Sequence, residues 1–411
     1  MVKKMYNDKN SLQHIFIFIF GLICGLKLTL FGEIYVGEIV AIIFSPLYLI
    51  FRKISKNELY FLLACFLWSI CQILSDIVNN TNFQDSLKGT LTPLVFLATI
   101  LFYFIFLKKG EKSLALFLLG ICFISIIQML VLPSDYQKIN IWKFGLGLMT
   151  LNVILIYFSF LSKGNKLNLF IAFLIFLIVS MVNDYRSMAF FPILGYLLYN
   201  FFQKRQVNLA LSKFTIIKII IPLVVSVILI NFIAAKMFES GYLNGVLPSE
   251  VDQKFRSQAT SDVGLILAGR SESLISLRAF MDAPFFGHGS WAKDYRYVDE
   301  YILLRFKYGL SNEIVETDKE LIPTHSYIMG SAVWYGFMGI LIWLFITNLV
   351  LKNYFRYATK LPIYFHVGII LFLWNLLFSP FGADARWNTG LFFAVFFVFI
   401  WHQKEHANKY Y

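Results

Sequence analysis

The sequence predicts an all-α polytopic membrane protein with about twelve transmembrane helices and one long extracytoplasmic loop that contains short helices. Of its 411 residues, 58% are hydrophobic and 15% are charged, whereas soluble domains have about 25% charged residues. The chain also contains many apolar runs of about 17 to 25 residues, the length that crosses a bilayer as a helix. This composition excludes a soluble enzyme, a nucleic-acid-binding domain and a disordered protein.

Twelve apolar runs lie between polar breaks, and each is expected to be helical because lipid offers no partner to backbone N–H and C=O groups. The runs cover residues 13–31, 34–51, 59–78, 90–107, 113–132, 141–161, 167–182, 188–202, 213–237, 324–350, 361–379 and 388–402. The seventh and eighth runs are short, so they are expected either to cross the membrane or to form a broken, re-entrant hairpin.

The basic residues predict the orientation of these helices, since cytoplasmic loops are rich in Lys and Arg. One alternating set of short loops and termini carries nineteen such residues and the other set carries five. Both termini are therefore expected in the cytoplasm. The chain then divides into transmembrane helices one to nine (1–237), an extracytoplasmic, periplasmic loop (238–322), and helices ten to twelve with a cytoplasmic tail (323–411). Within the loop, residues 274–281 are expected to form a short helix.

Motifs for nucleotide and metal chemistry are missing from the sequence. It contains no Walker A loop, no G-x-G-x-x-G, no G-x-S-x-G and no D-x-D pattern. The run His402-Gln403-Lys404-Glu405-His406 matches an inverted zinc-protease motif, but a tail in contact with lipid headgroups explains its place after the last span better. The net charge of +12 comes from short clusters between apolar runs. We therefore expect no metal, no cofactor and no nucleic-acid partner.

Several arginines lie on the predicted outer face, where topology signals do not require them. Arg186 follows the seventh run and Arg386 lies in the last outer loop. Arg270 and Arg278 are eight residues apart, so a helix would place them on one face. Each one alone is also explained by snorkelling at the membrane boundary. As a set they suit an anionic phosphate, because a guanidinium binds two oxygens at once.

His325 lies in the segment Pro323-Thr324-His325-Ser326-Tyr327, where the chain re-enters the membrane. With Thr324 as the helix cap, His325 would lie in the first turn, where the helix dipole favours the neutral imidazole. A neutral histidine can act as a general base. It can equally hydrogen-bond nearby backbone, and the residues alone leave both interpretations open.

Two segments resemble the O-antigen polymerase and O-antigen ligase family. That family pairs R…P-x-x-G-x-G in a long outer loop with H-[NS]-x-[YL]…G-x-x-G at the next span. The residues that carry the resemblance here are Arg270 with Asp282-Ala283-Pro284-Phe285-Phe286-Gly287-His288-Gly289, and His325-Ser326-Tyr327 with Gly336-Phe337-Met338-Gly339. Asp184-Tyr185-Arg186-Ser187 is similar to a further segment of the family, with Arg and Ser in reversed order. His288 stands where the family has a small or aliphatic residue.

The resemblance implies a glycosyltransferase of the C superfamily, metal-independent and inverting, in the bacterial inner (cytoplasmic) membrane with its active site facing the periplasm. A polymerase moves undecaprenyl-diphosphate-linked glycan onto another lipid-linked repeat unit, whereas a ligase moves it onto lipid A–core. We favour the polymerase. The ligase is the first alternative, and a lipid-linked oligosaccharide transporter is the second. The polar residues lie on one face rather than at mid-membrane, which is untypical of transporters.

The resemblance also implies roles for individual residues. His325 would act as the base, and Arg270 would stabilise the leaving group together with Arg186 and Arg278. The further substrate-binding candidates are Arg386, Tyr327 and His288. The expected partners are an undecaprenyl-diphosphate-linked oligosaccharide, membrane lipid and a chain-length regulator protein. Arg305 lies outside the motif and is expected to be dispensable.

Overall fold

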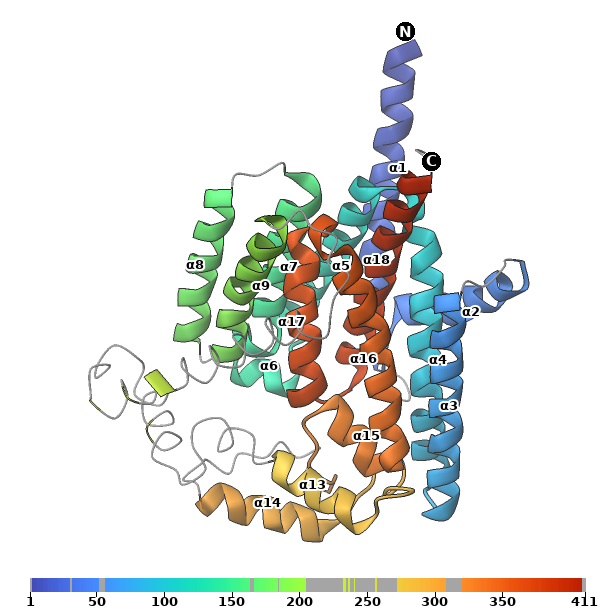
Figure 1. The fold of residues 1–411 in the computed structure, drawn as a ribbon, viewed down its shortest axis with the longest axis vertical. Helices are drawn as coiled ribbons and strands as arrows, with labels where there is room; N and C mark the ends of the chain where they lie inside the picture. Colours follow the sequence, from blue (N-terminus) through green and yellow to red (C-terminus); the bar gives the residue numbers. More distant parts are fainter. Residues whose placement is uncertain are drawn as a thin grey trace.

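The computed structural model describes residues 2–29, 32–51, 56–162, 166–183, 185–204, 232–233, 236, 240, 256, 272–307 and 320–408. Nearly all of these residues are helical (Figure 1), which confirms the all-α class. The main helices are α1 (Val2–Cys24), α2 (Val36–Phe51), α3 (Lys56–Val78), α4 (Phe83–Phe106), α5 (Glu111–Val131), α6 (Asp135–Ile139), α7 (Gly147–Ile156), α8 (Lys166–Val182), α9 (Arg186–Lys204), α13 (Glu272–Asp282), α14 (Tyr295–Lys307), α15 (Tyr327–Tyr335), α16 (Phe337–Tyr357), α17 (Ile363–Phe378) and α18 (Ala383–Asn408). Two π-helical turns, η2 (Trp142–Leu146) and η3 (Tyr157–Leu161), flank α7, and two 3-10 turns, η1 (Leu107–Lys109) and η5 (Ala358–Lys360), follow α4 and α16.

Six helices within these ranges are long and apolar enough to cross a membrane. They are Glu58–Val78, Phe83–Phe106, Glu111–Val131, Trp142–Leu161, Phe337–Lys360 and Ala383–Gln403. Four shorter apolar helices accompany them: Leu12–Cys24, Val36–Leu47, Lys166–Val182 and Ile363–Phe378. These helices indicate a membrane protein. The count of twelve spans stays a prediction, and the ninth expected span, 213–237, lies almost wholly outside the described residues.

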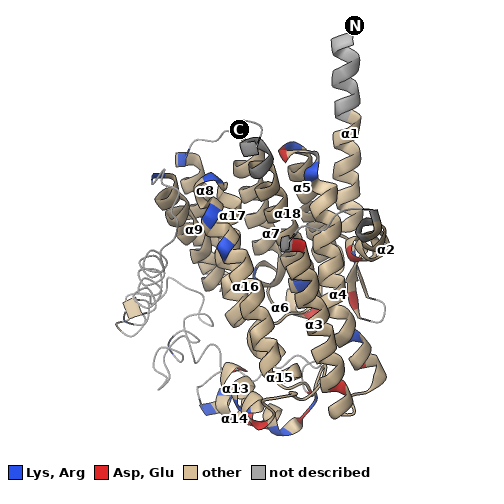
Figure 2. Cartoon of the chain, turned by 45° about the vertical axis from the view of Figure 1, so that its right-hand side comes forward, with Lys and Arg blue, Asp and Glu red and all other residues tan. Residues whose placement is uncertain are grey.

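Both chain termini lie at one end of the helix bundle, and α13 and α14 lie at the opposite end (Figure 1). Acidic and basic residues are mixed in this layer of α13 and α14 (Figure 2). The expected helix at 274–281 is confirmed as α13. The layer packs on the bundle through a small apolar cluster in which Ile275, Tyr297 and Val333 are buried.

The apolar interior has two larger parts. The main core lies among α1, α3, α4, α5, α16, α17 and α18 and includes the fully buried rings of Phe96, Phe117 and Trp343. A second core joins α7, α8, α9 and α17 around Phe173 and Phe176. Helix α17 contributes to both cores, so it connects the α8–α9 pair to the rest of the bundle.

The expected tenth helix, 324–350, is wrong as one continuous span. The chain forms α15 and α16 with a break at Gly336, whose φ of +73° lies in the left-handed region that favours glycine. The N–H of Phe337 donates to the Pro284 carbonyl at 2.7 Å. A Cβ at Gly336 would lie 2.3 Å from the carbonyl oxygen of Phe285. The helix therefore breaks where the segment directly after α13 packs against it.

The expected first helix, 13–31, also ends too late. Helix α1 stops at Cys24, and strands β1 (Lys27–Thr29) and β2 (Glu33–Tyr35) pair antiparallel before α2 begins. The side-chain amide of Gln128 on α5 bonds the backbone N–H and C=O of Lys27 at 3.0 and 3.1 Å. Gln128 therefore fixes the backbone of this hairpin to α5.

Candidate functional site

A cavity of about 2520 Å³ lies where the two cores meet. Its apolar lining includes Leu118 and Ile121 of the main core and Leu155 and Phe191 of the second core. Its charged and ionisable lining consists of Lys27, Glu33, Asp85, Lys88, Lys143, Glu272, Lys293, Arg305, Glu320, His325, Asp384 and Arg386, with several neutral polar residues. The lining of this one space therefore contains both charged and apolar residues.

The sequence-predicted residues divide between this cavity and other places. His325, Tyr327 and Arg386 line it. Arg186 begins α9, and its neighbours Tyr185 and Ser187 line the cavity. Arg270 lies outside the described residues, two positions before Glu272, which lines the cavity. Arg278 and His288 are not part of the lining.

His325 is held directly before α15. The N-cap of α15 is Ser326, whose hydroxyl accepts from the N–H of Met329 at 3.1 Å and donates to the Leu376 carbonyl at 2.8 Å. The expected cap at Thr324 is therefore wrong, and His325 precedes the helix instead of lying in its first turn. The imidazole is half-buried on the cavity wall.

Tyr327 packs the start of α15 against α18. Its side chain is fully buried, its ring contacts Trp343 and Phe381, and its hydroxyl lies 3.2 Å from Oγ1 of Thr389. These contacts hold the first residue of α15, two positions after His325, against α16 and α18.

Arg278 and His288 make their contacts within the layer of α13 and α14. The exposed guanidinium of Arg278 pairs with Glu300 of α14. Nε2 of His288 lies 2.8 Å from the Ala279 carbonyl, and its ring contacts Tyr297 edge-on. These contacts join α13, α14 and the loop between them.

The two motif segments of the sequence meet in space. Gly287 and Gly289 have φ of +69° and +88°, and the N–H of Gly289 donates to the Trp334 carbonyl of α15 at 3.0 Å. A Cβ on Gly287 would lie 2.5 Å from the backbone of Trp334. The glycines are thus required for close backbone contact between the segment after α13 and helix α15, which follows His325.

Helix α3 also contacts this junction between the segment after α13 and helix α15. The carboxylate of Asp76 accepts from the backbone N–H of Ser290 at 2.6 Å and from its hydroxyl at 2.8 Å. Gln72 donates to the same hydroxyl at 2.6 Å, and all three residues are buried. The hydroxyl of Ser75 donates to the Trp334 carbonyl at 2.6 Å. This buried network joins three elements that are distant in the sequence.

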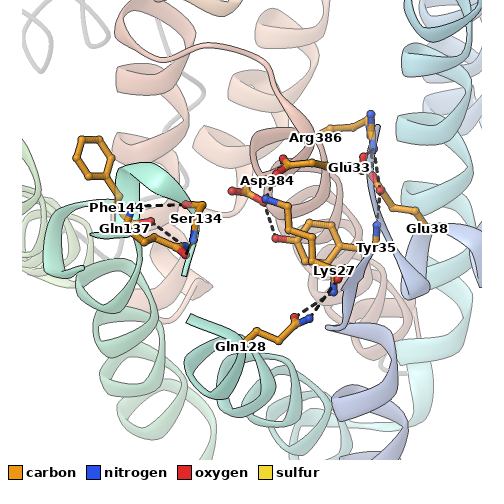
Figure 3. A network of polar contacts seen from close by, with 10 residues as sticks. All are labelled: Lys27, Glu33, Tyr35, Glu38, Gln128, Ser134, Gln137, Phe144, Asp384 and Arg386. Atoms are coloured by element: carbon orange, nitrogen blue, oxygen red, sulfur yellow. Dashed lines mark hydrogen bonds and ion pairs between the residues drawn. The ribbon is translucent and has the colours of Figure 1, made fainter. Parts of the chain in front are cut away.

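Arg386 forms a bidentate ion pair with Glu38 at the start of α2 (Figure 3). Nε lies 2.7 Å from Oε1 and Nη2 lies 2.8 Å from Oε2. The Glu38 side chain is fully buried and that of Arg386 is 12% exposed. Oε2 of Glu38 also accepts from the N–H of Tyr35 at 3.0 Å, so this carboxylate stabilises the start of α2 as well.

Lys27 lies beside this pair (Figure 3). Its ammonium is 2.8 Å from Glu33 and 2.9 Å from Asp384, and the hydroxyl of Tyr35 donates to Asp384 at 2.7 Å. These contacts fix the hairpin to the first turn of α18. Together with the Glu38–Arg386 pair, this region has three carboxylates, from Glu33, Glu38 and Asp384, and two cations, Lys27 and Arg386. This part of the cavity wall is therefore not strongly basic.

Arg305, which is expected from the sequence to be dispensable, lines the cavity. Its Nη1 donates to the Tyr301 hydroxyl at 2.9 Å, and that hydroxyl donates to Glu272 at 2.5 Å. Burial and the adjacent Glu272 carboxylate raise the pKa of Tyr301. Ser276 of α13 donates to the Pro323 carbonyl at 2.8 Å, so α13 is fixed close to His325. The four-residue spacing of Tyr301 and Arg305 was the available signal, because it places them on one helix face.

No group of three or more His, Cys, Asp or Glu side chains among the described residues could hold a metal ion. Comparison with known proteins finds no family model and no curated protein that matches this chain.

Proposed function

We propose that this protein is an integral membrane glycosyltransferase that polymerises a surface polysaccharide, in the manner of an O-antigen polymerase. It would transfer undecaprenyl-diphosphate-linked glycan onto another lipid-linked repeat unit in the bacterial inner membrane, with the active site facing the periplasm. One observation carries this proposal: His325 lines a large cavity whose lining contains both charged and apolar residues. A substrate with a sugar, a diphosphate and an isoprenoid chain requires both kinds of lining together.

His325 is the proposed base. His325 is half-buried and lines the cavity, and a neutral imidazole can take a proton from an acceptor hydroxyl. The hydroxyl oxygen then attacks the anomeric carbon, and the bond to the diphosphate oxygen breaks. Attack from the side opposite the diphosphate inverts the configuration at that carbon.

The departing diphosphate carries developing negative charge, which cationic donors stabilise. Arg270 and Arg186 are the proposed donors. Cavity-lining residues lie two positions after Arg270 and on both sides of Arg186, which supports this assignment. Arg278 is a weaker candidate than the sequence suggests, because it is exposed and paired with Glu300.

An O-antigen ligase is the alternative, since the same cavity and motif would serve transfer to lipid A–core. The proposed partners are the undecaprenyl-diphosphate-linked oligosaccharide, membrane lipid and a chain-length regulator protein. A strain that lacks its own polymerase distinguishes the two enzymes. With this protein, a polymerase restores a ladder of long glycans, whereas a ligase gives only single repeat units attached to lipid A–core.

A further inference from the structure

The buried pair of Glu38 and Arg386 connects the start of α2 to the first turn of α18. A buried ion pair contributes little net stability, because removing two charges from water offsets their attraction. Here the pair uses only one edge of the guanidinium. Nε and Nη2 bond Glu38, and Nη2 also lies 3.3 Å from the Glu33 carbonyl.

The other edge of the guanidinium, at Nη1, does not contact Glu38. Arg386 lines the cavity, and within the part of the chain that the structure describes Nη1 makes no hydrogen bond and is not one of the buried polar atoms that lack a partner. A carboxylate that holds one edge of an arginine leaves the opposite N–H groups in a fixed direction. This arrangement provides an oriented donor at low entropic cost.

Arg386 also lies on the helix face that contacts the segment around His325. It is three residues before Thr389 on α18, and residues at this spacing are neighbours on one face. Thr389 contacts the hydroxyl of Tyr327, two residues after His325. The side chains of His325 and Arg386 both line the same cavity.

We infer that Glu38 is a positioning residue, which orients the guanidinium of Arg386 so that Nη1 binds an anionic oxygen of the substrate in the cavity. The inference rests on the proposed function for the identity of that anion, a lipid-linked diphosphate. The sequence analysis named Arg386 but not Glu38, whose carboxylate lies 348 positions away in the sequence.

Variants of the pair separate a binding role from a structural one. Arg386→Gln removes the cation, and Arg386→Lys keeps the charge but loses the bidentate geometry. The double variant Glu38→Gln with Arg386→Met removes both charges and keeps an acceptor for the N–H of Tyr35. Replacing both members of a buried pair by neutral residues is often neutral for stability, so this variant is expected to fold. Arg296→Gln is the matched control, because Arg296 is exposed, pairs with Asp294 and does not line the cavity.

The experiment measures binding of undecaprenyl diphosphate to the purified full-length protein in detergent, with thermal unfolding of the ligand-free protein and glycan transfer measured in parallel. Inorganic diphosphate and a phospholipid vesicle extract are the comparison ligands, which separate headgroup binding from general lipid binding. We expect the double variant to unfold near the wild-type temperature while its affinity for undecaprenyl diphosphate falls about tenfold or more. Arg386→Lys should lose affinity as well, and Arg296→Gln should not.

Two results would overturn the inference. If the double variant binds and transfers like the wild type, the pair is a structural tie only. If Arg386→Gln binds normally while the wild type transfers glycan, the proposed function stands and the role of Arg386 is wrong. A wild-type protein that binds undecaprenyl diphosphate through Arg386 but transfers no glycan would support the inference and contradict the proposed function.

Discussion

Ser290 donates both its backbone N–H and its hydroxyl to the carboxylate of Asp76, although the two residues are 214 positions apart. This contact joins the segment between α13 and α14 to α3. The cavity residues Trp291 and Lys293 follow Ser290 in that segment. It provides a fixed attachment for one wall of the proposed active site.

Replacing Asp76 by Ala should therefore destabilise the protein. The change leaves two buried donors of Ser290 without their acceptor, which costs about 1–3 kcal/mol per group. The thermal unfolding temperature of the purified protein in detergent is the measurement. Asp135→Ala is the control, since the Asp135 side chain is 70% exposed and its pair with Lys138 is worth little. Equal unfolding temperatures for the two variants would show that the Asp76 contact does not hold the junction.

Gly336→Ala should also destabilise the protein. Alanine is strained at a φ of +73°, and its Cβ would meet the Phe285 carbonyl oxygen at 2.3 Å. Backbone strain of this kind costs about 1–3 kcal/mol. A Cβ at Gly382 meets nothing within 4 Å, so Gly382→Ala serves as the comparison in the same unfolding measurement. A Gly336→Ala protein as stable as the Gly382→Ala protein would argue against the break between α15 and α16.

Arg305 and Arg296 provide a matched test on one helix. Arg305 lines the cavity, whereas Arg296 does not, and the Arg296 side chain is 83% exposed. Arg305→Ala is expected to lower glycan transfer about tenfold, the effect of one charged hydrogen bond. Arg296→Ala should leave transfer unchanged. The readout is the glycan ladder, with protein level measured in each strain. Similar ladders from the two variants would return Arg305 to the dispensable role expected from the sequence.

The proposed topology can be tested at two exposed positions. Arg296 lies in the layer of α13 and α14, and Lys360 follows α16 at the end of the bundle that carries the termini (Figure 1). In cells with a permeable outer membrane, an impermeant maleimide should label a cysteine at Arg296 and not one at Lys360, because the basic loops face the cytoplasm. The native Cys24, Cys65 and Cys122 are buried, and Cys71→Ser removes the fourth. Labelling at Lys360 alone would invert the topology and remove the periplasmic site.

The sequence predicts local structure here better than long-range contacts. Apolar runs define most helices within a few residues, because a membrane segment must satisfy its own backbone. The apolar runs did not reveal the hairpin after α1. Its residue Lys27 forms an ion pair with Asp384, which is far away in the sequence. The break at Gly336 was likewise invisible in an apolar run, because it depends on backbone contacts with Pro284 and Phe285.

The candidate site shows the same limit. His325 and Arg386 were recognisable as polar residues at predicted membrane boundaries, and both line the cavity. Glu38 and Asp76 were missed because a single acid near the end of an apolar run has no pattern of its own. Their partners are Arg386 and Ser290, which only the folded chain brings near. The motif glycines Gly287 and Gly289 are needed for close backbone packing, which their spacing in the sequence does not reveal.

The most direct test of the account is glycan transfer by the purified protein in liposomes that contain undecaprenyl-diphosphate-linked repeat units and no other enzyme. The account predicts a ladder of polymerised glycan from the wild type. It predicts none from His325→Ala or Arg270→Ala, each inserted and folded like the wild type. Loss of one such oxyanion-stabilising donor typically lowers the rate about 10²–10³-fold. A wild-type protein that forms no ladder, or a His325→Ala protein that forms a normal one, would contradict the central claim.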